Sequence, residues 1–309
     1  MAQQQFQDLG FGAKAAEARA RLLNRDGSFN IRRKGLSFFK SFSAYHYLIQ
    51  MPWWKFNALV LLSYIVINAL FGAIYLAIGT DGLNGIDGHA LSDRYLQSIF
   101  FSTQTFTTVG FGRIAPIGTA ANITAALESL AGLLSFALAT GLLYGRFSRP
   151  VARIIFSRHA VIAPFQDFTG FMFRIANERG NQLIDVSATL TLSRLEDDGS
   201  GRARVRRFQE LELERNRVNF FHLSWTVVHP IDAKSPLSGV TKQQLDDSDA
   251  EFLILIKAFD DTFSTTVHTR TSYKSKEVVF NSKFTSIIRT APDGITEIDL
   301  DRIHEYDTV

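Results

Sequence analysis

The feature that most constrains this chain is a run without charged residues from Asn57 to Ile78, NALVLLSYIVINALFGAIYLAI. A helix of about 20 apolar residues crosses the ~30 Å hydrocarbon core of a bilayer. A second uncharged run extends from Ser129 to Gly145, and continuing it back to Ile117 adds one charged residue, Glu128. Uncharged runs of this length are costly to bury as core helices of a soluble domain, so the sequence predicts two membrane-spanning helices.

Charge is distributed unevenly around these two runs. Basic residues flank their outer ends and acidic residues lie between them: Arg32, Arg33, Lys34 and Lys40, then Arg146, Arg149, Arg153 and Arg158, with Asp81, Asp87 and Asp93 in the connecting segment. Positively charged segments stay on the cytoplasmic side of a membrane, so both termini are expected in the cytoplasm. Residues 1–35 contain charges and no apolar core of a signal peptide, and we expect them to form a mobile segment.

The stretches around the first run suggest two shorter helices. Residues 35–54 mix aromatic and basic side chains with a spacing of three and four, which favours a helix in the membrane interface that ends at Pro52. Residues 79–89 are rich in glycine and predict a loop. Residues 95–105 predict an apolar helix of about three turns, which is too short to span a bilayer.

The short helix leads into TFTTVGFG, residues 105–112. A Gly-x-Gly can form a tight turn or part of a dinucleotide-binding loop, although that loop needs a third glycine between a strand and a helix. At membrane depth, irregular backbone is tolerated only where it is buried in protein or lines a watery cavity. The flanks therefore favour a third interpretation, in which backbone carbonyls and the Thr108 hydroxyl face a dehydrated cation, while Val109 and Phe111 point outward and pack against the short helix.

The chain after Arg146 has an ordinary soluble composition and a β pattern from about Ala160. Three strands are predicted at residues 206–214, 220–229 and 252–259, with a turn at Asp260-Asp261 and one or two helical turns over 240–245. Strands at such spacing indicate an all-β sandwich. The chain has no cysteine, which excludes disulfides and thiolate metal sites.

The residues TTVGFG between two spanning helices resemble the selectivity filter of potassium channels. The interfacial helix, the two crossings and GLLYGRFSRPVARIIFSRHAVIAPF at 141–165 resemble bacterial inward-rectifier potassium channels, from about Phe39 to the C-terminus. The resemblance implies a homotetramer in the bacterial inner membrane, permeant K⁺ without a cofactor, and gating by a cytoplasmic domain and lipids. It also implies three parts: a segment 1–35, a pore domain 36–150 and a cytoplasmic immunoglobulin-like β-sandwich 151–309.

The resemblance assigns roles to residues of the filter region. The filter itself is Thr108, Val109, Gly110, Phe111 and Gly112, supported by Gln104, Thr107, Arg113 and Glu128. Two residues depart from the family pattern, because Arg113 occupies a position that is often acidic and Gln104 replaces a common glutamate. A brace of Arg113 with Glu128, or of Gln104 with backbone, is the expected substitute.

The second spanning helix carries the residues expected to line and close the pore. Gly132 matches the family's hinge glycine, although close helix packing explains a glycine equally well. Phe136, Thr140 and Tyr144 are spaced by four, so they can share one pore-facing stripe. Tyr144 matches the family's bulky gate residue; the alternative is a tyrosine at the membrane interface. Phe136 replaces the acidic residue of strong rectifiers, so block by Mg²⁺ or polyamines is expected to be weak.

Arg146, Arg149 and Arg153 follow the gate, where members of the family bind anionic lipid headgroups; ordinary positive charge at a cytoplasmic helix end is the alternative. The seven histidines show no metal spacing, and His159 is a candidate pH sensor. No nucleophile–base pair indicates an enzyme, and no nucleic-acid partner is expected. Two other functions remain open: a weakly selective cation channel, and a membrane-anchored β-sandwich that binds a ligand.

Overall fold

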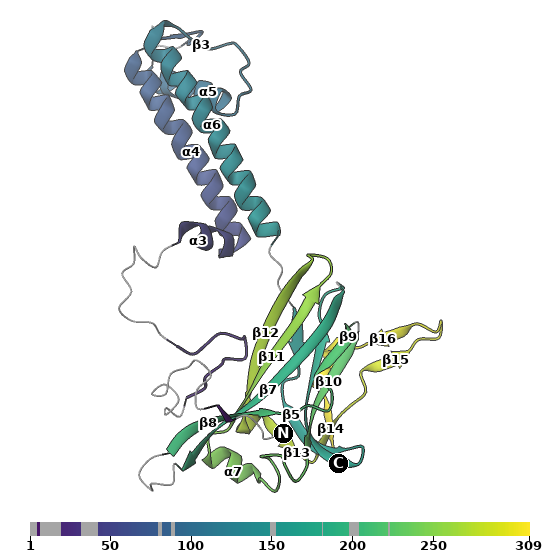
Figure 1. Ribbon diagram of the computed structural model, residues 1–309. Helices are drawn as coiled ribbons and strands as arrows, with labels where there is room; N and C mark the ends of the chain where they lie inside the picture. Colours follow the sequence, from purple (N-terminus) through teal and green to yellow (C-terminus); the bar gives the residue numbers. More distant parts are fainter. Residues whose placement is uncertain are drawn as a thin grey trace. The chain divides into compact units, whose positions relative to one another are not determined.

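The computed structural model describes residues 5–6, 20–31, 43–79, 82–87, 90–148, 153–180, 182–197, 204–221 and 223–309. The chain divides into two compact units. The helical unit comprises Gly35–Arg149, and the β unit comprises Met1–Lys34 together with Pro150–Val309. Figure 1 shows the helices of the first unit and the sheets of the second.

Two long helices, α4 (Trp53–Ile78) and α6 (Gly118–Phe147), run side by side in the helical unit (Figure 1). Both are long and apolar enough to cross a membrane, as the two uncharged runs predict. Helix α4 begins directly after Pro52, which is its N-cap. The short α3 (Ala44–Gln50) precedes it, and the Ser43 side chain caps α3 by accepting from the His46 N–H.

Helix α5 (Leu91–Phe106) packs against both long helices and has 16 residues, which is longer than the predicted three turns. At 1.5 Å per residue it is about 24 Å long, still short of a bilayer core. Its contact with α4 is close at Gly72, where an added Cβ would lie 2.7 Å from Ile99 Cγ1. The Tyr95 hydroxyl also donates to the Ala69 carbonyl at 3.1 Å.

Two short strands, β2 (Leu83–Asn84) and β3 (Ala115–Pro116), pair antiparallel and join the segments before α5 and before α6. This pairing ties together the two ends of the segment that contains α5 and residues 107–114. A sequence read one segment at a time does not reveal this pairing.

The β unit contains two main sheets. The first runs β1 (Gln5–Phe6), β8 (Arg204–Leu211), β7 (Leu183–Asp197), β11 (Glu251–Asp260) and β12 (Thr265–Lys274), with β9 (Arg217–Phe221) also on β7. The second runs β10 (Ser224–Ile231), β6 (Phe168–Asn177), β5 (Ala160–Phe165) and β13 (Val278–Phe280), with β4 (Ile154–Phe156) also on β6.

Smaller elements complete this unit: α7 (Lys242–Asp247), the 3₁₀ helices η2 (Ser275–Glu277) and η3 (Leu300–His304), and two two-stranded sheets, β14 (Ser282–Phe284) with β17 (Tyr306–Thr308) and β15 (Ile288–Thr290) with β16 (Thr296–Ile298). Helix α7 carries a capping box between Thr241 and Gln244. It covers the helical turns expected near residues 240–245.

The two sheets face each other across one hydrophobic core. Phe171 of β6 stacks on Phe252 of β11, with ring centroids 4.2 Å apart, and both side chains are fully buried. The predicted sandwich is therefore present as a β-rich domain. One edge differs from the purely antiparallel sheets of immunoglobulin domains, because β13 pairs with β5 in parallel.

The strand predicted over 220–229 is wrong as a single element. The structure divides it into β9, which pairs with β7 of the first sheet, and β10, which pairs with β6 of the second. The chain crosses from one sheet to the other between them. Aromatic residues lie on both sides of the crossing, so the composition of residues 220–229 does not indicate a break between two strands.

The expectation of a mobile segment over residues 1–35 does not fit residues 20–31, which pack on the β unit. The N–H groups of Leu22 and Leu23 donate to the buried Glu251 carboxylate at 2.9 and 3.1 Å. Arg21 pairs with Glu277 at 3.0 Å. These partners lie more than 200 positions away from residues 21–23 in the chain, so nothing in the local sequence indicates them.

Candidate functional site

The segment after α5 folds back over the end of that helix. The N–H groups of Val109 and Gly110 both point to the Gln104 carbonyl, at 2.9 and 3.3 Å, and the Thr108 N–H points to Thr105 at 3.1 Å. These bonds satisfy carbonyls that the end of a helix would otherwise leave unpaired. The predicted filter residues therefore begin directly at the C-terminus of α5, the end that carries partial negative charge.

The backbone alternates in this segment. Thr108, Gly110 and Gly112 have φ angles of +60°, +52° and +78°. A left-handed residue at every second position turns successive carbonyls toward the same side, which an extended strand of L-residues cannot do. An added Cβ would meet nothing within 4 Å at Gly110 or Gly112, so backbone conformation, not space, is the reason for glycine.

Thr108 adopts the same conformation without being glycine. A β-branched residue with positive φ is uncommon and costs free energy. The surrounding structure must therefore hold it there. Its position at the start of the predicted filter places the strain where the backbone is expected to perform its function.

The side chains of the segment are exposed in the single chain. Val109 is 54% and Phe111 78% exposed, so within the single chain α5 covers only part of Val109 and little of Phe111. Thr107 is exposed as well, and its hydroxyl donates to the Thr103 carbonyl of α5 at 2.7 Å. The face that carries Val109 and Phe111 is thus open to contacts outside the single chain.

The residues predicted to brace the segment 108–112 make the following contacts within the single chain. Arg113 pairs with Asp87 at 3.3 Å, and both side chains are more than 70% exposed. Such surface pairs contribute little to stability. Within the described ranges of the chain, no hydrogen bond or ion pair joins Arg113 to Glu128, and the Gln104 carbonyl accepts from the backbone N–H groups of Val109 and Gly110.

Glu128 is fully buried in a polar cluster between the three helices. The Tyr75 hydroxyl donates to it at 2.7 Å, and the Ser102 hydroxyl contacts its other oxygen. Ser102 also lies 3.1 Å from the Asn68 side-chain oxygen. The sequence indicated Glu128 but not these three partners, although Asn68 and Tyr75 are seven apart and so share one face of α4.

Gly132 packs against the end of α5. An added Cβ would overlap the Phe106 carbonyl oxygen and lie 3.2 Å from the Phe106 Cα. Helix α6 continues without a break through this position. Of the two explanations for this glycine, the structure supports close packing, with the short helix α5 as the neighbour.

Phe136 and Tyr144 are each 74% exposed, and Thr140 is exposed between them. The Thr140 hydroxyl donates to the Phe136 carbonyl at 2.9 Å. The three side chains therefore form a largely exposed stripe along α6. A stripe that lines a pore between several chains must be open in this way on one chain.

Arg146, a predicted lipid ligand, contacts the end of α3 within the chain. Its guanidinium donates to the carbonyls of Leu48, Ile49 and Met51, at the end of α3. It also lies over the Trp53 ring, 4.5 Å from the centroid. Arg146 thus caps α3 and anchors it to α6 through its two terminal nitrogens, Nη1 and Nη2, while its buried Nε has no partner among the residues that the structure describes.

The other two predicted lipid ligands differ from Arg146. Arg153 is about half exposed and lies 3.9 Å from Glu178, a loose pair. Arg149 lies outside the described residues. His159, the candidate pH sensor, lies in the β unit, where burial and the positive charges of Arg25 and Arg158 lower its pKa.

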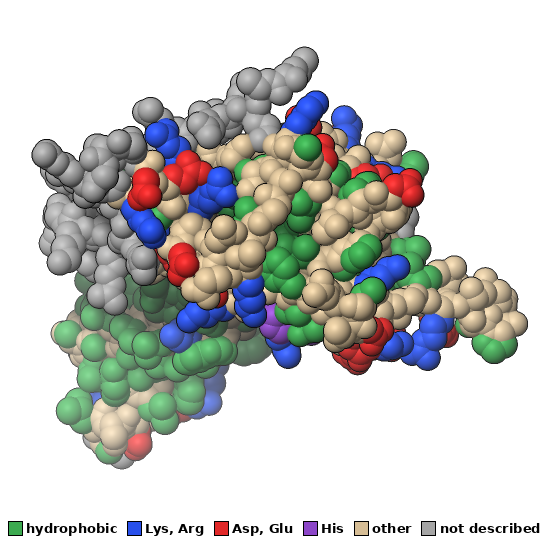
Figure 2. All heavy atoms as spheres, turned by 90° about the horizontal axis from the view of Figure 1, so that it is seen from below, with side chains coloured by type: hydrophobic (Ala, Val, Ile, Leu, Met, Phe, Trp, Pro, Cys, Tyr) green, Lys and Arg blue, Asp and Glu red, His purple; other side chains and the backbone are tan. Residues whose placement is uncertain are grey.

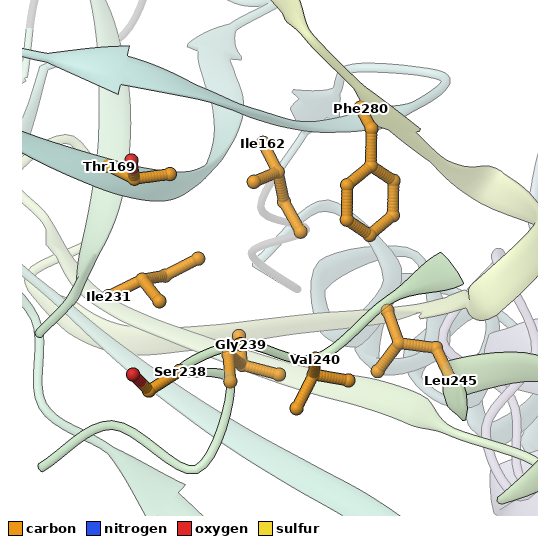
Figure 3. Close-up of a pocket in the computed structure, with 9 residues that line it drawn as sticks. Ile162, Thr169, Ile231, Ser238, Gly239, Val240, Leu245 and Phe280 are labelled. Atoms are coloured by element: carbon orange, nitrogen blue, oxygen red, sulfur yellow. The ribbon is translucent and has the colours of Figure 1, made fainter. Parts of the chain in front are cut away.

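The β unit has a cavity of about 260 Å³ beside α7, shown in Figure 3. Ile162, Thr169 and Phe280 line one side, and Ile231, Val240 and Leu245 lie opposite. Its lining residues carry no charge, and none of the predicted site residues is among them. In the described part of the chain, no three His, Cys, Asp or Glu side chains are grouped as metal ligands.

Hydrophobic side chains cover the outside of α4 and α6. Leu61, Leu62, Leu133 and Leu134 are each about 60% exposed. Figure 2 shows hydrophobic side chains gathered on one part of the surface, while basic and acidic side chains intermingle on another. An apolar surface of this extent marks contact with lipid or protein.

Two family models match this chain. One, described as "Inward rectifier potassium channel C-terminal domain", matches residues 154–309, and one described as "Ion channel" matches residues 59–149. The "Inward rectifier potassium channel Kirbac3.1" of Paramagnetospirillum magnetotacticum is 39% identical, over 95% of this chain and 98% of its own length.

Mammalian relatives are more distant. The "G protein-activated inward rectifier potassium channel 3" of Homo sapiens is 24% identical over 93% of this chain and 77% of its own. The "G protein-activated inward rectifier potassium channel 2" of Mus musculus is 25% identical over 82% of this chain and 64% of its own. These relatives and the matched families are ion channels, not enzymes.

Proposed function

The chain belongs to the inward rectifier potassium channel family, and from this premise we propose that four copies form a K⁺-selective pore with Thr108–Gly112 as its filter. The observation that carries the proposal is the alternation of positive φ at Thr108, Gly110 and Gly112. Carbonyls turned to one side replace the hydration shell of a permeant cation.

The exposed side chains favour assembly around that filter. Val109 and Phe111 are too hydrophobic to remain in water, and the Phe136, Thr140 and Tyr144 stripe is largely exposed on the single chain. A ring of copies covers Val109 and Phe111 with neighbouring chains and turns the stripe toward a common axis. Burial of apolar surface, at about 25 cal/mol per Å², stabilises such an assembly.

Tyr144 is the proposed gate. Four tyrosine rings on the axis near the ends of the α6 helices form a narrow apolar constriction, which stops ions by excluding water. The β unit follows α6 in the chain, so a movement of that unit reaches the gate through the segment after Phe147. Anionic lipids are proposed to act at Arg149 and Arg153, since Arg146 is engaged with α3.

The distribution of charge sets the proposed orientation. The basic residues before α4 and after α6 stay in the cytoplasm, so both termini and the β unit lie there, with the filter toward the opposite side. Permeant K⁺ is the only ligand that the pore requires. Mg²⁺ and polyamines, if they block, enter the pore from the cytoplasmic side.

Single-channel recording in liposomes tests this function. The purified protein is reconstituted with K⁺ on one side of the membrane and Na⁺ on the other. A reversal potential far toward the K⁺ equilibrium value is expected. A potential near zero would instead identify a weakly selective cation channel, and the absence of any current under activating conditions would favour a membrane-anchored binding protein.

A further inference from the structure

We propose that Glu128 is a neutral carboxylic acid in the folded channel, and that its cluster with Tyr75, Ser102 and Asn68 positions α5 behind the filter. The four side chains come from three helices: Asn68 and Tyr75 from α4, Ser102 from α5 and Glu128 from α6. All four are at most 2% exposed. The part of this inference that concerns ion flux rests on the proposed function; the protonation of Glu128 does not.

The number of hydrogens in the cluster indicates the neutral acid. There are three oxygen–oxygen contacts: Tyr75 with Glu128, Ser102 with Glu128, and Ser102 with Asn68. Each contact needs one hydrogen. The two hydroxyls, of Tyr75 and Ser102, supply only two.

Asn68 does not supply the third hydrogen. Its amide nitrogen donates to the Tyr64 carbonyl one turn earlier in α4, at 2.7 Å, which directs its oxygen to Ser102. That oxygen can only accept. The third hydrogen must therefore belong to Glu128.

A protonated Glu128 satisfies every contact. Its O–H donates to the Ser102 oxygen, Ser102 donates to the Asn68 oxygen, and Tyr75 donates to the second carboxyl oxygen. An ionised Glu128 would take the Ser102 hydrogen and leave two oxygens, of Ser102 and Asn68, facing each other 3.1 Å apart without one. Buried oxygens that face each other in this way are unfavourable.

The surroundings of the cluster also disfavour a charge. Tyr75 packs edge-on against Phe101, with ring centroids 5.0 Å apart, and Leu83 and Ile114 complete the apolar shell. Among the described residues, the hydrogen-bonding partners of Glu128 are Tyr75 and Ser102, and neither carries a positive charge. A charge at membrane depth without a partner is expensive.

The cluster lies where it can fix the filter. Ser102 is two residues before Gln104, whose carbonyl accepts the N–H groups of Val109 and Gly110. Glu128 is one turn before Gly132, which contacts the last residue of α5. The carboxyl group of α6 thus supports the short helix from behind and complements the support that the Gln104 carbonyl gives to residues 109 and 110.

Infrared spectroscopy of the reconstituted full-length channel tests the protonation. The carbonyl band of a buried, protonated carboxylic acid should be present in the native protein at neutral pH and absent from Glu128→Gln. An unchanged spectrum in Glu128→Gln would mean that Glu128 is ionised, and would overturn the proposal regardless of whether the protein conducts.

The K⁺ concentration that protects the tetramer against thermal dissociation tests the positioning. Glu128→Gln keeps the size, the lack of charge and both hydrogen-bonding atoms, so it should behave as the native protein. Glu128→Leu removes the hydrogen bonds and should require several-fold more K⁺ and conduct Na⁺ more readily.

Leu130→Ala, an exposed change on the same helix, controls for general effects on α6 and should leave the K⁺ requirement unchanged. The positioning role fails if Glu128→Leu matches Leu130→Ala in both readouts. It also fails if Glu128→Gln is as defective as Glu128→Leu.

Discussion

Gly132 of α6 leaves no room for a side chain, because the Phe106 carbonyl at the end of α5 occupies the space that its Cβ would take. We expect Gly132→Ala to push α5 away from α6 and to destabilise the protein by about 1–3 kcal/mol, as overpacking does in cores. Thermal unfolding of the reconstituted tetramer measures the change.

Gly141→Ala is the matched control on the same helix. A Cβ at Gly141 meets nothing within 4 Å, and alanine is favoured over glycine inside a helix by about 0.5–1 kcal/mol. The two substitutions should therefore shift the melting temperature in opposite directions. Equal shifts would mean that Gly132 is present for bending and not for packing.

Acid should weaken the β unit through Asp249. Burial alone would raise the pKa of its carboxyl group, but hydrogen bonds from Lys274 and Arg206 outweigh burial and lower this pKa below its ordinary value of 3.8. A lowered pKa in the folded state gives stability that is present above the unfolded pKa and is lost as the pH falls through the folded pKa.

The full-length chain should therefore lose stability between about pH 5 and about pH 2, and Asp249→Asn should make that loss smaller while lowering the stability at neutral pH. Calorimetry across this range gives both quantities. If Asp249→Asn is as stable as the native chain at neutral pH and loses stability equally in acid, the hydrogen bonds from Lys274 and Arg206 contribute nothing to stability.

Tyr144 is 74% exposed on the single chain, and four such rings are proposed to close the pore. Tyr144→Ala widens the constriction and admits water, so the open probability should rise while the K⁺-to-Na⁺ permeability ratio stays constant. Tyr144→Phe keeps the ring and should remain closed like the native channel. Single-channel recording that finds Tyr144→Ala no more open than Tyr144→Phe would remove this residue from the gate.

Phe136 is uncharged, so four copies of this residue give the proposed pore cavity no ring of carboxylates. Spermine on the cytoplasmic side should block the native channel weakly, and Phe136→Asp should produce strong voltage-dependent block, because four carboxylates attract a polyvalent cation strongly in a low-dielectric cavity. Phe136→Asn is the neutral control of similar shape. Strong native block that disappears in Glu128→Gln would contradict both this assignment and the buried, neutral Glu128.

The two membrane-spanning helices could be predicted because a long uncharged run rarely forms any other structure. The length of α5 could not, because Ser92, Asp93 and Arg94 suggest a polar cap whereas the helix begins at Leu91. The positive φ values of Gly110 and Gly112, in the proposed filter, could be predicted because glycine adopts them without strain. The positive φ of Thr108 could not be predicted, because a β-branched residue has no local preference for this backbone conformation.

The contacts that hold the site together were the least predictable. Glu128 bonds to Ser102 and Tyr75, which are 26 and 53 positions away, and Leu22 bonds to Glu251 across 229 positions. Such pairs follow from how the elements pack and leave no local pattern. The contacts of Arg146 with the carbonyls of Leu48, Ile49 and Met51 were not predicted, for the same reason.

The central claim is that the backbone of residues 108–112 conducts K⁺, and Gly110→Ala tests it most directly. Gly110 has a φ of +52° and open space around its Cβ position, so alanine disturbs the conformation of the backbone without a clash inside the chain. The measurement is K⁺ flux into liposomes that contain the variant, purified as an assembled tetramer. The account predicts that flux is abolished while assembly is retained. Undiminished, K⁺-selective flux through the Gly110→Ala tetramer would contradict it.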